Sequence, residues 1–191
     1  RSHLKLFSSK KLIPFWSLLA LNIEHAQLVD LKQERRVITV VSPWLTDVEL
    51  ALHPSGQHSS LGMRPDALSM KLSDALRWFC ANAWQVNVAV LRYGESYAGL
   101  SKDPAKFQRE RSVLKSLVAA GARVFLCPGL HAKGIATPLG VVTGTTNYTH
   151  SGMHLQMQNA FYFPFDHPDY PKTYAQLCAF ARPEWQAVAI P

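Results

Sequence analysis

The chain contains 191 residues, 48% of them apolar, with 12 prolines spread along its length. This length is enough to bury one sizeable hydrophobic core but too short for two, so we expect a single domain. The formal net charge of +7 favours a polyanionic partner through long-range attraction and counterion release, although many basic proteins bind no nucleic acid.

The N-terminal segment 1–34 combines basic residues with the apolar run LIPFWSLLALNI. This outline is typical of a signal peptide, and that alternative stays open. However, Pro14 interrupts the run, Glu24 follows it at once, and no small-x-small cleavage site is present. The run is also too short to span a bilayer. Its apolar spacing instead predicts an amphipathic helix packed on the domain, and no membrane partner is expected.

Three cysteines occur, Cys80, Cys127 and Cys178, without a CxxC motif or a paired His/Cys spacing. An odd number of thiols without metal-ligand spacing indicates buried, reduced cysteines rather than disulfides or a metal site. A cytoplasmic location is therefore expected.

The first predicted strand is RRVITVV, residues 35–41, which stops at the loop SPWLTD, residues 42–47. A surface loop is expected over 53–66, because this stretch is rich in Gly, Ser, Pro and His and has no periodicity. Helical spacing of apolar residues then predicts a helix over 67–84. The run QVNVAVL, residues 85–91, is expected to form the next strand.

A second strong helix is predicted over 103–120. Asp103 is a suitable N-cap, Pro104 suits the first helical position, and Gly121 suits a left-handed C-cap. The run ARVFLC follows as another strand. Because strands alternate with helices, the sequence predicts an α/β sandwich: a mixed, mainly parallel sheet flanked by helices.

The stretch GLHAKGIATPLGVVTGTTN, residues 129–147, is expected to form one compact unit. Alternation in LHAKGIA predicts a strand with His131 and Lys133 on one face. TPLG is expected to make a hairpin turn, VVT to return as a strand, and Gly144–Asn147 to close a tight turn near His131. This unit suits covalent phosphoryl chemistry, because an imidazole can attack phosphorus while an ammonium and an amide hold the oxygens that gain charge.

The charge around this unit also favours an anionic ligand. From Arg111 to Phe165 the sequence contains no Asp and no Glu, while it carries four Lys or Arg and three His residues. The H-x-K spacing alone is a weak signal, because His3 and Lys5 repeat it without the turn or the strand context. A structural histidine beside a solvated lysine is the alternative.

HAK followed by GTTN, YTHSG and QN, with SPWLTD after the first strand, resembles the H-x-K…G-S-x-N signature of the phospholipase D superfamily. The resemblance implies metal-free hydrolysis or transfer of phosphodiesters through a phosphohistidine, without a cofactor. It implies that His131 is the nucleophile, that Lys133 and Asn147 bind the phosphate, and that Thr145 stands where the family usually has Ser.

The resemblance covers residues 37–163 and implies a single phospholipase D-like domain over 1–191. In this domain, 1–34 would be an N-terminal helical segment, 35–165 the catalytic core and 166–191 a C-terminal helix.

The sequence departs from the family pattern at two positions. The family Asp that follows the Lys falls on Pro138, although some members, including the tyrosyl-DNA phosphodiesterases, also lack it. An acidic residue that often follows the turn Asn falls on Gln158. Its amide can accept one hydrogen bond from an imidazole N–H but stabilises an imidazolium less than a carboxylate does.

A single H-x-K copy with the following turn implies a homodimer. Phosphohistidine chemistry needs two imidazoles on opposite sides of phosphorus, one to attack and one to protonate the leaving oxygen. A two-fold dimer would place both His131 side chains in one shared site. Alternatively, His150 or His154 supplies the acid within one chain.

Nucleic acid is the expected substrate, with DNA favoured over RNA, because short single-copy relatives are mostly nucleases and lipid-processing relatives usually carry two copies. We therefore expect an endonuclease.

A helical face with Lys106, Arg109, Arg111 and Lys115 could follow a nucleic-acid backbone or could simply be solvated. Trp44, Trp78 and Trp84 could stack on bases, or belong to the core. The alternatives are a weakly active or inactive nucleic-acid-binding subunit of a DNA-processing, modification or defence system, and a phospholipid hydrolase.

Overall fold

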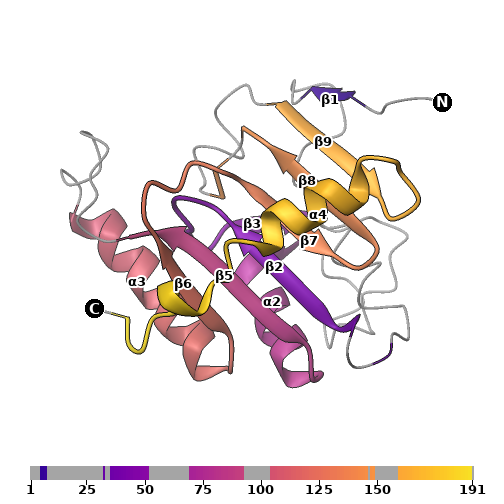
Figure 1. The fold of residues 1–191 in the computed structure, drawn as a ribbon. Helices are drawn as coiled ribbons and strands as arrows, with labels where there is room; N and C mark the ends of the chain where they lie inside the picture. The colour runs from indigo at the N-terminus through magenta and orange to yellow at the C-terminus, as the bar shows by residue number, and fades with distance from the viewer. Residues whose placement is uncertain are drawn as a thin grey trace.

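A computed structural model gives the fold and describes residues 5–7, 32, 35–51, 69–92, 104–145, 147–148 and 159–190. At its centre is a seven-stranded sheet with the strand order β1-β9-β8-β7-β2-β5-β6 (Figure 1). In chain order these strands are β1 (Lys5–Phe7), β2 (Val37–Val41), β5 (Gln85–Leu91), β6 (Arg123–Cys127), β7 (Gly134–Thr137), β8 (Gly140–Gly144) and β9 (Asn159–Pro164).

The sheet is mixed, as predicted, but its parallel part is limited to three strands. β2 pairs with β5, and β5 with β6, in parallel. The β2–β7, β7–β8, β8–β9 and β1–β9 pairs are antiparallel, so the expectation of a mainly parallel sheet is corrected. At the TPLG turn, only two residues connect β7 to β8. A connection this short can join antiparallel strands, whereas parallel strands need a long crossover.

Helices cover both faces of this sheet, which confirms the predicted α/β sandwich. α2 (Leu72–Ala81) and α3 (Pro104–Ala119) pack against β5 and β6 on one face, while α4 (Tyr170–Cys178) lies across β7, β8 and β2 on the other (Figure 1). Side chains alternate between the two faces, so Val40 belongs to the core under α2 and α3, while Val41 belongs to the core under α4.

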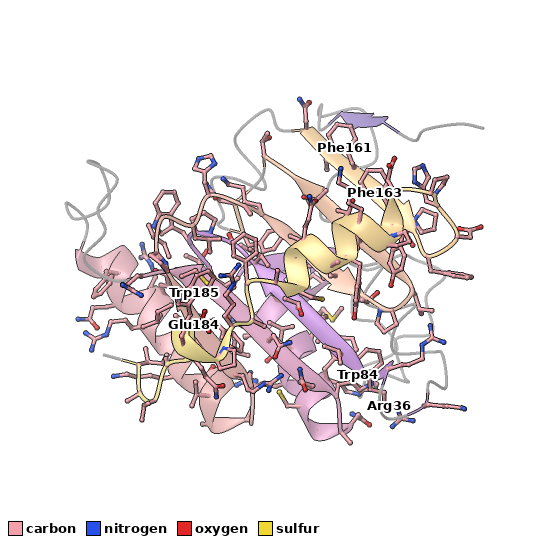
Figure 2. The ribbon with its side chains drawn as sticks, in the orientation of Figure 1. Arg36, Trp84, Phe161, Phe163, Glu184 and Trp185 are labelled. Carbon is pink, nitrogen blue, oxygen red and sulfur yellow. The ribbon has the colours of Figure 1, made fainter. Side chains whose placement is uncertain are left out.

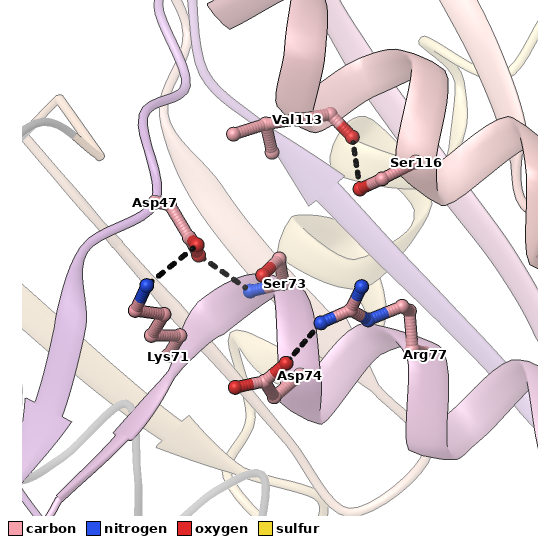
Figure 3. A network of polar contacts seen from close by, with 7 residues as sticks. All are labelled: Asp47, Lys71, Ser73, Asp74, Arg77, Val113 and Ser116. Carbon is pink, nitrogen blue, oxygen red and sulfur yellow. Dashed lines mark hydrogen bonds and ion pairs between the residues drawn. The ribbon is translucent and has the colours of Figure 1, made fainter. Parts of the chain in front are cut away.

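A small separate ladder precedes α2. β3 (Glu49–Ala51) and β4 (Ser69–Lys71) pair antiparallel, so the helix predicted over 67–84 begins later, at Leu72. Asp47 fixes this start, because its Oδ1 accepts a hydrogen bond from the Ser73 backbone N–H at 3.2 Å (Figure 3). A carboxylate at a helix N-terminus satisfies an unpaired N–H and interacts favourably with the helix dipole.

α3 agrees closely with its predicted range of 103–120. Gly121 has a φ of 100°, and its N–H donates to the Val118 carbonyl oxygen at 2.9 Å. The Ala122 N–H donates to the Leu117 carbonyl oxygen at 3.0 Å. The left-handed C-cap predicted at Gly121 is therefore confirmed.

The single C-terminal helix predicted over 166–191 is wrong in extent. α4 ends at Cys178, and a short 3₁₀ helix, η4 (Pro183–Trp185), follows. Arg182 is extended, with a φ of −85° and a ψ of 135°, because a residue before proline disfavours the helical region. Beyond η4, Gln186 bridges to Phe125 and the Ala187 N–H donates to the Val124 carbonyl oxygen at 2.8 Å, along the outer edge of β6.

Other expectations for the N-terminal half lie outside the described residues. These are the helix predicted before residue 32 and the loop over 53–66; within the segment 1–34, Lys5–Phe7 form β1. No helix in the described ranges combines the length and the apolar character that crossing a membrane requires. The three cysteines are free, and burial raises the pKa of Cys127 to about 12, against smaller opposing effects of Arg182 and Arg92.

Candidate active site

The described residues of the predicted site meet at one edge of the sheet. The parallel strands β2 and β5 end at this edge. β7 begins there, because Gly134 pairs with Val41, and β8 ends there, because Thr143 pairs with Gly134. The carboxyl ends of parallel strands are where open α/β sheets generally bind ligands.

His131 and Lys133 lie just before β7, so the strand predicted over LHAKGIA is wrong at its start. The neighbouring strand β2 ends opposite Gly134, so residues before Gly134 have no strand partner on the β2 side. Their side chains nevertheless meet, because the Lys133 Nζ lies 3.4 Å from the His131 Nδ1 and donates to the His131 carbonyl oxygen at 2.6 Å. His131 is exposed, whereas Lys133 is only 6% exposed.

The burial of Lys133 affects both residues. Burial lowers the pKa of Lys133, because removing an ammonium group from water disfavours its charged form. A protonated Lys133 can only donate, so this contact makes the His131 Nδ1 an acceptor and places the imidazole proton on Nε2.

The turn after β8 is anchored to β9 at its first end. A Cβ on Gly144 would lie 2.0 Å from the Asn159 carbonyl oxygen, so only glycine fits there without moving the backbone. The next residue makes two hydrogen bonds with Asn159: the Thr145 N–H donates at 3.0 Å, and the Thr145 Oγ1 accepts from the Asn159 N–H at 3.1 Å. The Thr145 hydroxyl thus ties the turn to β9.

The second end of the turn is anchored to the SPWLTD loop. Tyr148 is fully buried, and its N–H donates to the Ser42 Oγ at 3.1 Å. Its carbonyl oxygen accepts from the Thr46 N–H at 2.9 Å, and Leu45 forms a parallel bridge with it. The backbone on the C-terminal side of Asn147 is therefore fixed by this loop.

Asn147 itself is half-buried and has an unsatisfied group. Its Oδ1 is buried and has no hydrogen-bond partner among the residues that the structure describes. A buried amide oxygen without a partner is costly, so this position suits a bound ligand. Rotation of the amide about χ2 exchanges oxygen and nitrogen, and the side chain can then offer donors to a phosphate.

Glu110 was not among the predicted site residues. It lies on α3, is 7% exposed, and its Oε1 accepts from the Leu45 N–H at 2.7 Å. The sequence does carry a signal for it, because Glu110 shares the i, i+4, i+7 stripe of α3 with Leu114 and Leu117, which are both buried. An acid on an apolar stripe needs a hydrogen-bond partner inside the fold.

Pro138, at the position where the motif of the phospholipase D superfamily has Asp, lies at the far end of the hairpin. It follows β7, which starts next to Lys133 and ends at Thr137. Five residues of extended chain span about 17 Å, so a side chain at position 138 is remote from His131. Pro138 instead suits the turn, where the Thr137 hydroxyl donates to the Gly140 carbonyl oxygen at 3.2 Å.

The tryptophans are explained mainly by packing. Trp84 is 8% exposed and packs edge-on against Phe79 with 4.8 Å between ring centroids, and Trp78 packs against the same core. Trp84 precedes β5, at the end of the sheet away from the site (Figure 2). Trp44 is half-buried and packs against the core under α4, as does Ala132, the residue between His131 and Lys133.

The remaining candidates are either exposed or outside the described residues. On α3, Arg109 and Lys115 are exposed, while Arg111 is half-buried with its guanidinium 5.5 Å from the centre of the Phe107 ring. The side chain of Lys106 lies outside the described part of the chain, as do His150, His154 and Gln158. Within the described ranges, no three His, Cys, Asp or Glu residues gather where they could hold a metal ion.

Comparison with known proteins adds structural relatives. No protein-family model and no curated protein matches the sequence. The fold is similar to that of Nuc from Salmonella typhimurium, a phospholipase D family member, with a TM-score of 0.50 and 12% identity over 95% of this chain and 96% of that one. It is also similar to NucT from Helicobacter pylori, with a TM-score of 0.52 and 11% identity over 92% and 94%. The chain therefore has the phospholipase D-like fold that its H-x-K and G-T-T-N motifs predict.

Proposed function

We propose that this chain is a metal-independent phosphodiesterase that cleaves nucleic acid through a phosphohistidine on His131. The observation that carries the proposal is the 3.4 Å contact between the His131 Nδ1 and the Lys133 Nζ. It occurs at the edge of a phospholipase D-like sheet where the turn with Asn147 also lies. An exposed imidazole, a buried ammonium group and an unsatisfied amide at one edge are the groups that phosphoryl transfer requires.

In the proposed reaction, His131 attacks phosphorus through Nε2, so a P–N bond forms while the P–O bond to the leaving group breaks. The incoming phosphate draws the Lys133 ammonium away from Nδ1, and the imidazole proton can then move to that nitrogen. Lys133 and Asn147 donate to the non-bridging oxygens as these gain charge. The amide oxygen of Gln158 would accept a hydrogen bond from the Nδ1–H, and water then hydrolyses the P–N bond.

A second imidazole is needed to protonate the leaving oxygen and later to activate water. We propose that it is the His131 of a second copy, in a two-fold homodimer. Support comes from the exposure of His131 at the sheet edge, which leaves its ring accessible to another chain. One imidazole then serves as base and the other as acid.

The alternatives remain a binding subunit without turnover and a phospholipid hydrolase. Two departures from the motif, Pro138 and Gln158, favour the subunit without turnover. Pro138 lies about 17 Å along the strand from Lys133, so the absence of Asp there should not affect the reaction at His131. Gln158, which stabilises an imidazolium less than a carboxylate does, still favours that alternative. The net charge of +7 and the exposed Arg109 and Lys115 on α3 favour nucleic acid over lipid, with DNA expected over RNA.

The test is an assay of the purified chain on end-labelled single- and double-stranded DNA and RNA in excess EDTA, beside a phospholipid assay. Cleavage of nucleic acid should persist in EDTA, and a single-turnover reaction should leave one nucleic-acid fragment joined to His131 through an acid-labile P–N bond. His131→Ala should abolish both signals. His3→Ala should change neither, because His3 shares only the H-x-K spacing.

Three outcomes would oppose the proposal. Loss of activity in EDTA with recovery in Mg²⁺ contradicts the phosphohistidine route. Binding of nucleic acid without cleavage favours the binding subunit, and cleavage of phospholipid alone favours the lipid enzyme.

A further inference from the structure

The SPWLTD loop connects the candidate site to both helices on one face of the sheet. Its start is held to β5, because the Ser42 N–H donates to the Ala89 carbonyl oxygen at 3.0 Å. Its end is held to α2, because Asp47 accepts from the Ser73 N–H at 3.2 Å and its Oδ2 lies 3.8 Å from the Lys71 Nζ (Figure 3). These contacts fix the two ends of the loop but not its middle.

The middle of the loop is held by Glu110 of α3. The 2.7 Å hydrogen bond from the Leu45 N–H to the Glu110 Oε1 is buried and joins residues 65 positions apart. Leu45 is 1% exposed and forms the parallel bridge with Tyr148, and the next residue, Thr46, donates to the Tyr148 carbonyl oxygen at 2.9 Å. The carboxylate of Glu110 is therefore two contacts away from the backbone of Tyr148.

Tyr148 transmits this constraint to Asn147. Its N–H belongs to the peptide group that follows Asn147, and it donates to the Ser42 Oγ at 3.1 Å. Because that peptide group is fixed, the orientation of Asn147 depends on the position of the loop. At the other end of the turn, Thr145 is held by Asn159. The Asn147 side chain therefore sits between two anchored ends, and Glu110 supports one of them.

We infer that Glu110 is a positioning residue, which acts through the SPWLTD loop and Tyr148 to set the orientation of the Asn147 amide. The role of Asn147 as a phosphate ligand rests on the proposed function, but the orientation of its amide does not. A misplacement of about 1 Å at a reacting group can cost about 100-fold in rate, so one buried hydrogen bond remote from the phosphate can control turnover.

The test compares two replacements of similar size. Glu110→Gln keeps an acceptor oxygen for the Leu45 N–H, whereas Glu110→Met removes it. We expect Glu110→Met to lower kcat by about 10- to 100-fold with a smaller change in KM, and Glu110→Gln to recover most of that loss. The control lies on the same helix: Ser116→Ala removes a hydroxyl that donates within α3, to the Val113 carbonyl oxygen at 2.8 Å.

A second measurement does not depend on turnover. The Asn147 side-chain amide resonance, assigned by its loss in Asn147→Asp, should shift in Glu110→Met and stay near its wild-type position in Glu110→Gln and Ser116→Ala. If the resonance does not move in Glu110→Met, or if Glu110→Gln is as impaired as Glu110→Met, the inference is wrong. If wild type cleaves no phosphodiester yet the resonance follows this pattern, the proposed function fails while the positioning role of Glu110 stands.

Discussion

The Lys133 ammonium group donates to the His131 carbonyl oxygen at 2.6 Å and lies 3.4 Å from the Nδ1 of the same residue. In the proposed reaction it must also donate to phosphate. These roles require the charged form, which burial disfavours. Lys133 is therefore the residue at which pH should act on turnover at the alkaline end.

The first prediction concerns this alkaline limb. Because the pKa of Lys133 is lowered from its ordinary value of 10.5, the ammonium group loses its proton at a lower pH than an exposed lysine does. The value of kcat/KM should therefore fall as pH rises, with an apparent pKa below 10.5. Lys133→Arg should move that limb to higher pH in whatever activity it retains, since guanidinium stays charged. Lys115→Arg, on the exposed face of α3, should leave it in place.

The second prediction concerns loss of the phosphate donors. Lys133→Ala and Asn147→Ala should each lower kcat by about 100-fold or more, because in the proposed reaction both groups donate to oxygens that gain charge in the transition state. Circular dichroism should confirm that the variants are folded. A rate near that of wild type in Lys133→Ala would show that this lysine does not contribute to turnover, and Lys172→Ala, at an exposed lysine of α4, is the control.

At the scale of elements, the β7–β8 hairpin carries the site at one end and its turn at the other. The site end is held by the Thr143 hydroxyl, which donates to the Lys133 carbonyl oxygen at 2.8 Å, and by the contact of Gly144 with Asn159. The turn end is held by Thr137, whose carbonyl oxygen accepts from the Tyr170 hydroxyl of α4 at 3.1 Å. Changes at the two ends should therefore have different effects.

The third prediction is that Gly144→Ala destabilises the protein and impairs the site. A Cβ would lie 2.0 Å from the Asn159 carbonyl oxygen, so β8 and β9 must separate. Forced backbone shifts of this kind cost about 1–3 kcal/mol or more, and kcat should fall because the turn with Asn147 moves. Gly129→Ala serves as the comparison: its φ of 60° is strained for alanine, but an added Cβ would have no atom within 4 Å. Urea unfolding and turnover of both variants provide the measurement.

The fourth prediction is that introducing the Asp of the phospholipase D motif at position 138 does not increase turnover. Pro138→Asp places the carboxylate at the turn end of the hairpin, remote from His131. We expect kcat within about twofold of wild type and a small loss of stability, because proline restricts the unfolded chain. A large increase in kcat would mean that position 138 acts on the site.

Most of the local elements could be predicted because each has a short-range cause. Gly121 ends α3 through its left-handed φ, and the β-branched and apolar run over 85–91 forms β5 over the predicted range. The missed features have long-range causes. Ser69–Lys71 leave the predicted helix to pair with β3, and His131 falls outside β7 because β2 ends at Val41. Such pairing partners are distant in the sequence and leave no local pattern.

In the candidate site, too, residues with a local sequence signal were predicted, and a residue defined by long-range packing was missed. The motif indicated His131 and Lys133, and the structure brings their side chains together. Glu110 was missed because an acid on a helix usually faces solvent, and only the packing of α3 shows that it reaches Leu45. The roles of these residues stay predictions.

For the whole molecule, the main question is whether one chain can complete the reaction. The fifth prediction is that wild-type protein mixed with excess His131→Ala forms heterodimers that lose most of their turnover. Each heterodimer would hold a single His131 in the shared site and would lack the opposing acid. General acid–base catalysis typically raises a rate by about 10²–10⁴-fold. Activity that falls only in proportion to the wild-type chains would show that each chain works alone. His150 and His154 would then be the histidines to replace.

The C-terminal segment beyond η4 also affects the behaviour of the molecule in solution. β6 is an outermost strand of the sheet, and the pairing of Gln186 with Phe125 and the hydrogen bond from Ala187 to Val124 occupy part of its outer edge. An uncovered edge strand offers unpaired N–H and C=O groups on which other chains can assemble into aggregates. Removing residues 183–190 would uncover the apolar strand RVFLC. This short segment therefore helps to protect the protein from aggregation.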